Sequence, residues 1–146
     1  MKIIALSDTH NQHNHIRVPD GDILVHCGDF TNQGTLDEIT SFADWFALLP
    51  HKWKILVFGN HEVSTDIGFY DSNWKDLHSH KMKIIPPTFW TQRGITVLCN
   101  ETINIQGYNI WGHPALPFQY NLHAWGYRSP EDSSSMWSQV PADTDI

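Results

Sequence analysis

The stretch that decides the fold is Asp22-Ile23-Leu24-Val25-His26-Cys27-Gly28-Asp29, in which an unbroken apolar run leads directly into glycine and aspartate. A short apolar run bounded by turn residues is typical of a strand buried on both faces, as in a parallel sheet. The same order occurs twice more, where residues 2–7 lead into Asp8-Thr9-His10 and residues 53–58 lead into Gly59-Asn60-His61. The sequence therefore predicts three buried strands, each followed by a polar loop.

A strong helix pattern separates the second and third strands. Thr35 and Glu38 fit a capping box, and apolar residues recur at helical spacing from Leu36 to Leu49, just before Pro50. This order of strands and helix predicts an α/β fold with a parallel sheet. Ligands of such sheets gather beyond the carboxyl ends of the strands, so we expect the three loops to meet at one edge.

The remaining chain carries weaker signals. We expect a helix over residues 71–80, a helix from Ser129 to about Val140, and short antiparallel strands over 95–99, 102–106 and 109–111.

Composition favours one domain, residues 1–146, of an acidic protein. Sixteen acidic and nine basic residues give a formal net charge of −7, which disfavours a stable nucleic-acid complex. No apolar run is long enough for a membrane span, and the first residues become charged too early for a signal peptide. Cys27 and Cys99 fall in strand-like runs, so we expect them to be buried and reduced in a cytoplasmic protein.

Histidine is unusually abundant, because ten histidines outnumber the nine lysines and arginines together. His26 falls inside a predicted strand and is interpreted as a hydrogen-bonded core residue. Polar, loop-like contexts indicate surface positions for a further six histidines, namely His13, His15, His51, His78, His80 and His123.

The residues with a claim on chemistry are those of the three loops: Asp8, His10, Asp29, Asn60 and His61. Each taken alone has an ordinary explanation, since aspartate and asparagine are common in turns. Together they offer oxygen and nitrogen ligands without a thiolate, a set that suits Mn²⁺, Fe²⁺ or Zn²⁺.

The motifs Asp8-Thr9-His10, Gly28-Asp29 and Gly59-Asn60-His61-Glu62 resemble the first three signature blocks of the calcineurin-like metallophosphoesterases. Residues 19–31 and the stretch Ile110-Trp111-Gly112 are similar to the metallophosphoesterase-domain-containing phosphodiesterases within that superfamily. The resemblance implies a βαβαβ sandwich with metal loops at the carboxyl ends of its strands.

The resemblance also implies an enzyme, one that hydrolyses phosphodiesters or phosphomonoesters with two divalent metal ions. Asp8 and His10 would hold one metal, Asp29 would bridge both, and Asn60 would bind the second. A hydroxide bridging the metals would attack phosphorus, and His61 would stabilise the transition state or protonate the leaving oxygen. The resemblance assigns no catalytic role to Glu62.

The chain departs from the family after the third block, because it contains neither the later ligand histidine nor the Gly-His-x-His block of complete members. We therefore expect a fold truncated in its second half, with metal ligands missing. His113 is a weaker candidate for the site, and a second copy of the chain could complete it. The alternative function is a weakly active or inactive metal-binding or interaction module.

The expected partner is a small phosphate ester, of which a nucleotide is one type. Aromatic residues in the second half suit either core packing or stacking on a base; they are Trp111, Phe118, Tyr120, Trp125 and Tyr127.

Overall fold

A parallel sheet forms the centre of the computed structural model, which describes residues 1–117, 123–126 and 129–146. Its strands are β1 (Ile3–Leu6), β2 (Ile23–His26), β3 (Trp53–Leu56) and β4 (Ile95–Val97), in the order β1-β2-β3-β4. All three neighbouring pairs are parallel, which confirms the predicted α/β fold. The prediction of an antiparallel strand at 95–99 is wrong, because β4 pairs in parallel with β3.

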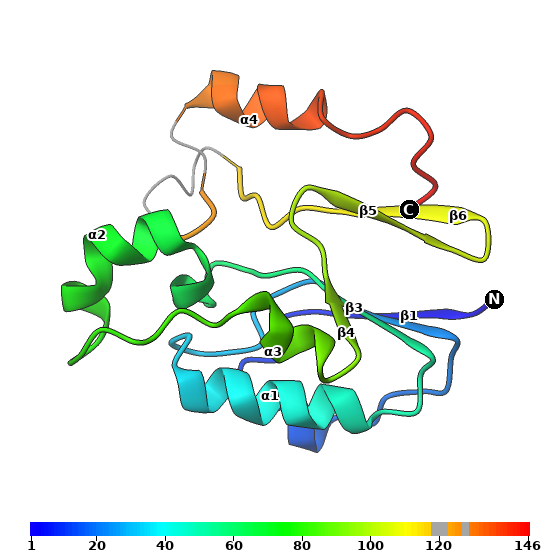
Figure 1. Cartoon of the computed structure of the whole chain (residues 1–146), viewed down its shortest axis with the longest axis horizontal. Coiled ribbons are helices and arrows are strands. Elements are labelled where there is room, and N and C mark those ends of the chain that lie inside the picture. The colour runs from blue at the N-terminus through cyan, green and yellow to red at the C-terminus, as the bar shows by residue number, and fades with distance from the viewer. Residues whose placement is uncertain (118–122, 127–128) are drawn as a thin grey trace.

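The two faces of the sheet are covered differently (Figure 1). Helices α1 (Leu36–Leu48) and α3 (Pro87–Thr91) lie on one face, where Phe30, Phe42 and Phe46 are fully buried. The predicted antiparallel strands form a hairpin of β5 (Glu101–Ile105) and β6 (Tyr108–Gly112), which lies on the other face of the sheet. Both faces of the central strands are therefore buried, which is why these strands read as unbroken apolar runs.

Helix α1 begins and ends where the sequence predicts. The Thr35 hydroxyl accepts a hydrogen bond from the Glu38 N–H, and the Glu38 carboxylate accepts one from the Thr35 N–H, so the capping box is complete. The helix ends at Leu48, two residues before Pro50, which cannot continue it.

The other helices differ more from the predictions. Helix α2 (Ile67–Leu77) begins earlier than expected, because the Asp66 carboxylate accepts a hydrogen bond from the Phe69 N–H and caps it. Helix α4 (Pro130–Trp137) ends before Val140. Two short 3₁₀ helices, η1 (His13–His15) and η2 (Val63–Thr65), follow the first and third strands. Within the described ranges, every helix is too short or too polar to cross a bilayer.

Burial corrects several predictions about single residues. Cys27 and Cys99 are both exposed free thiols, because each lies just beyond the paired part of its strand. His13 and His51 are buried rather than at the surface. His26 is fully buried, as predicted, and its Nε2 lies 3.1 Å from the Thr9 hydroxyl.

Candidate metal centre

The polar loops after β1, β2 and β3 meet beyond the carboxyl ends of these strands. Backbone hydrogen bonds join the first loop to the second, from Asp8 N–H to the Gly28 carbonyl and from His10 N–H to the Asp29 carbonyl, both at 3.0 Å. Asp8, His10 and Asp29 have φ angles of 54°, 39° and 56°. This left-handed backbone conformation costs free energy for residues other than glycine, so the surrounding contacts must hold these three residues in it.

Two glycines allow the second and third loops to approach each other. A Cβ atom at Gly28 would lie 2.5 Å from the Gly59 nitrogen, and a Cβ atom at Gly59 would collide with the Asp29 carboxylate. Because no real side chain fits these spaces, glycine is required at both positions for the Asp29 carboxylate to lie against the third loop.

Three of the predicted residues form a cluster of candidate metal ligands, which we call the ligand triad: His10, Asp29 and His61. One ligand atom from each lies within 4.8 Å of the other two. The two imidazole rings meet edge to face, with centroids 4.6 Å apart, and the Asp29 Oδ1 accepts a hydrogen bond of 3.0 Å from the His61 N–H. Residues 19 to 51 positions apart along the chain thus supply one mixed oxygen and nitrogen site.

Hydrogen bonds to main-chain carbonyls orient both histidines of the triad. The His10 Nδ1 lies 3.0 Å from the Thr31 carbonyl oxygen, and the His61 Nδ1 lies 2.7 Å from that of Asn32. A carbonyl oxygen only accepts, so Nδ1 carries the proton in each ring and Nε2 keeps its lone pair. This is the arrangement in which histidine binds a metal, and the residues present therefore fit a divalent ion.

Glu62 is the residue of this region to which the sequence assigns no role. Its carboxylate is fully buried and accepts four hydrogen bonds of 2.8–2.9 Å, from the N–H groups of Gly59, Asp29 and Thr31 and from the Thr31 hydroxyl. Burial raises the pKa of the Glu62 carboxyl, and the four donors lessen that rise. Glu62 joins the second loop to the third and fixes the backbone of Asp29.

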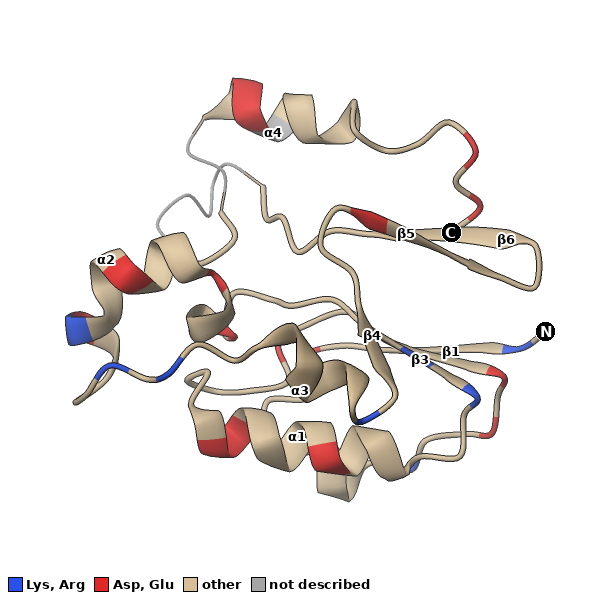
Figure 2. Cartoon of the chain, viewed as in Figure 1, with Lys and Arg blue, Asp and Glu red and all other residues tan. Residues whose placement is uncertain are grey.

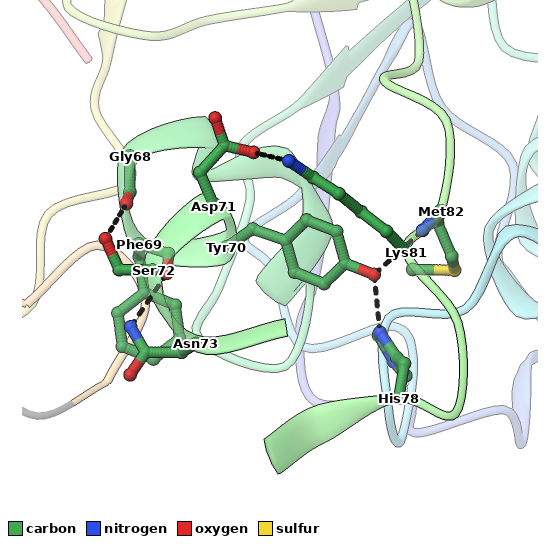
Figure 3. A network of polar contacts seen from close by, with 9 residues as sticks. All are labelled: Gly68, Phe69, Tyr70, Asp71, Ser72, Asn73, His78, Lys81 and Met82. Carbon is green, nitrogen blue, oxygen red and sulfur yellow. Dashed lines mark hydrogen bonds and ion pairs between the residues drawn. The ribbon is translucent and has the colours of Figure 1, made fainter. Parts of the chain in front are cut away.

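A second network attaches the segment after α2 to the same loops (Figure 3). The Tyr70 hydroxyl lies 2.8 Å from the His78 Nδ1 and accepts a hydrogen bond from the Met82 N–H. The His78 Nε2 in turn lies 3.0 Å from the Gln33 carbonyl, one residue beyond the Asn32 carbonyl that orients His61. The network therefore supports the part of the second loop that positions His61.

The other predicted site residues lie outside the triad. Asp8 is exposed in the first loop, and Asn60 is half-buried between Gly59 and His61. His113 lies after β6, where its Nδ1 accepts a hydrogen bond from the Ala115 N–H and its ring stacks on Trp111. Of the aromatic candidates, Trp125 stacks against Phe58, whereas Phe118, Tyr120 and Tyr127 lie outside the described residues.

The electrostatics of the centre favour a cation. Figure 2 shows acidic residues in the loops beyond the strand ends, while basic residues occur in the segment after α2. Burial lowers the pKa of His26 to about 4, although the nearby Asp8 carboxylate acts to raise it. The His26 ring is therefore neutral at pH 7 and adds no positive charge beside Asp8.

Comparisons with known proteins agree with this geometry. The family model for the calcineurin-like phosphoesterases matches residues 1–145. The chain is 33% identical over 156 residues to the UPF0046 protein K07C11.7 of Caenorhabditis elegans, covering 100% of this chain and 49% of that protein. It is 30% identical over 154 residues to the human metallophosphoesterase domain-containing protein 1, covering 99% of this chain and 46% of that protein. The chain spans about half the length of the curated relatives it matches.

Proposed function

Because the chain belongs to the calcineurin-like phosphoesterase family, we propose that it hydrolyses phosphoesters with divalent metal ions at the ligand triad. The observation that supports this most directly is the approach of the three ligand atoms to within 4.8 Å of one another. Phosphodiesters are the substrates we favour, a nucleotide-type phosphate ester is a further candidate, and Mn²⁺ is the ion we would supply first.

Five side chains take part in the proposed site. His10 and Asp29 would hold metal. Asp8 and Asn60, in the same loops, would supply further ligands. When bound, divalent ions supply Lewis-acid chemistry, in that they acidify a water molecule and withdraw charge from the phosphoryl oxygens.

Although its ring belongs to the ligand triad, His61 has a separate proposed role: it acts toward the phosphoryl group and not as a metal ligand. Its Nδ1–H is held by the Asn32 carbonyl, so only Nε2 can turn toward a substrate. When the ring carries a second proton, on Nε2, it can donate that proton to the ester oxygen as the phosphorus–oxygen bond breaks, which makes His61 the candidate general acid.

Hydrolysis of bis(4-nitrophenyl) phosphate with Mn²⁺ tests the proposal. We expect Asp29→Asn to lower kcat/KM by more than about a hundredfold, because it removes the charge of a ligand and turns one of its two oxygens into an amide group that cannot bind metal. Asp76→Asn, an exposed position on α2, is the matched control and should not change the rate. Equal rates for wild type and Asp29→Asn would contradict the proposal. Mn²⁺ binding by calorimetry without any hydrolysis would support the metal-binding module instead.

A further inference from the structure

A pocket that the proposed chemistry does not use lies beside the third loop. We call it the β4 pocket; its volume is about 270 Å³. It lies where Phe58, η2, the start of α2, the segment before α3 and the end of β4 meet. Pockets for whole drug-sized ligands span roughly 300–1,000 Å³, so this one has room for a single ring-sized group.

The walls of the β4 pocket are apolar. Phe58 and Trp90 form one wall, with ring centroids 5.5 Å apart, and Ile67, Ile84 and Val97 contribute aliphatic surface. Ile67 is 48% exposed and Ile84 is 60% exposed, which is unusual for large aliphatic side chains beside a cavity. Exposed aliphatic surface gathered around a concavity is typical of a binding site.

The polar groups of the pocket are not suited to bind phosphate. The Ser64 hydroxyl donates to the Gly34 carbonyl and the Thr65 hydroxyl donates to the Glu62 carbonyl, so both protons are already engaged. Glu101 adds negative charge at the pocket. An anionic group is therefore repelled, and an uncharged apolar group is favoured.

The β4 pocket and the candidate centre share the third loop. Phe58 precedes Asn60 by two residues, so their Cα atoms lie at most about 8 Å apart. Ser64, on the other side of the same loop, follows His61 by three residues. Residues 58–64 therefore contribute to both the β4 pocket and the ligand triad.

From this arrangement we propose that the β4 pocket receives the apolar part of the substrate, an aryl or similar ring-sized ester group, while its phosphate lies at the ligand triad. The inference rests on the proposed function, because the triad must bind the phosphoryl group. It assigns a preference for phosphoesters with an apolar group over those with a small or charged one.

Phenylphosphonate and methylphosphonate provide a test, because they share the phosphonate head group and differ in the apolar group, and at pH 9 both heads are doubly charged. In the Mn²⁺-loaded protein, we expect phenylphosphonate to bind roughly tenfold more tightly, measured by calorimetry and by competition with bis(4-nitrophenyl) phosphate. Val97→Trp, which fills the pocket, and Ile84→Ser, at an exposed position that tolerates substitution, should each remove most of this preference. Leu48→Ser, 86% exposed at the end of α1, is the matched control and should keep it.

Cys99 gives a second measurement that does not depend on activity. Its thiol lines the β4 pocket, and Cys27 is the other thiol of the chain, so both can be followed in one protein by alkylation and peptide mass spectrometry. We expect phenylphosphonate to slow alkylation of Cys99 at least several-fold more than methylphosphonate does, with no such difference at Cys27.

The outcomes separate this inference from the proposed function. Protection of Cys99 and tighter phenylphosphonate binding without hydrolysis would overturn the catalytic proposal and support the pocket. Hydrolysis with equal binding of both phosphonates, and equal protection of Cys99 by both, would overturn the pocket and leave the catalytic proposal standing.

Discussion

Replacing Glu62 by glutamine tests whether this buried carboxylate holds the candidate centre together. Glutamine keeps the shape of the side chain but turns one acceptor oxygen into a donor amide. Each Glu62 oxygen faces two donors, Oε2 those of Gly59 and Asp29, and Oε1 the N–H and hydroxyl of Thr31. The amide is best placed toward Thr31, whose hydroxyl can rotate to accept, but the Thr31 N–H then faces another donor.

The expected loss of stability follows from these contacts. A buried N–H without a partner costs about 1–3 kcal/mol, and the two remaining hydrogen bonds weaken because they no longer end on a charged group. The neutral amide is easier to bury than a carboxylate, which offsets part of the loss. We expect Glu62→Gln to lower the free energy of unfolding by about 2 kcal/mol.

Urea denaturation in EDTA, followed by tryptophan fluorescence, measures this loss without a contribution from metal. Calorimetry with Mn²⁺ should also show 10- to 100-fold weaker binding, the range typical of residues that support metal ligands. Glu131→Gln, on the exposed first turn of α4, is the control and should stay within about 0.5 kcal/mol of wild type. Wild-type stability together with wild-type Mn²⁺ affinity in Glu62→Gln would refute the positioning role.

Three further predictions concern the structure around the centre. The pKa of His26 lies near 4 in the folded protein and near 6.5 in the unfolded chain, so only the unfolded chain gains a proton between these values. The free energy of unfolding should therefore fall by about 3 kcal/mol as the pH drops from 6.5 to 4. If the free energy of unfolding of a His26→Gln variant fell just as steeply with pH as that of the wild type, the prediction would be contradicted. Gly59→Ala should lower the free energy of unfolding by more than about 3 kcal/mol in urea denaturation, because its Cβ collides with Asp29. The control Gly68→Ala in α2 should be neutral or stabilising by up to about 1 kcal/mol. Similar losses of stability in both variants would argue against the collision. Thr35→Ala should cost about 1 kcal/mol in the same assay, because it removes the hydroxyl that accepts from the Glu38 N–H, and an unchanged midpoint would show that this cap is dispensable.

The parts of the fold that were predictable depend on local sequence. Apolar runs followed by polar loops identify β1 to β3, and the pairing of Thr35 with Glu38 locates the start of α1. The sequence gives no sign that β4 runs parallel to β3. Its three paired residues are apolar, polar and apolar, a pattern that fits a parallel strand and an antiparallel strand equally well. Alternation and capping report on neighbours in the chain and not on which strand a segment will join.

The same limit applies to the site. His10, Asp29 and His61 were predictable because parallel strands deliver their loops to one edge. The role of Glu62 depends on donors 31 and 33 residues earlier in the chain, and buried His51 depends on the Pro19 carbonyl, 32 residues away. Such long-range partners become visible only once the fold brings them together.

The left-handed conformations of Asp8, His10 and Asp29 have a consequence for laboratory evolution. Glycine adopts such φ angles without strain, so glycine at the exposed Asp8 would relieve about 1 kcal/mol in the metal-free chain, whereas at His10 or Asp29 it would also remove a hydrogen bond of the side chain. A library selected for thermal tolerance alone, in the presence of a chelator, should therefore enrich glycine at Asp8. Heat resistance and metal affinity would then diverge in the selected clones, and directed improvement of this protein has to select for both at once.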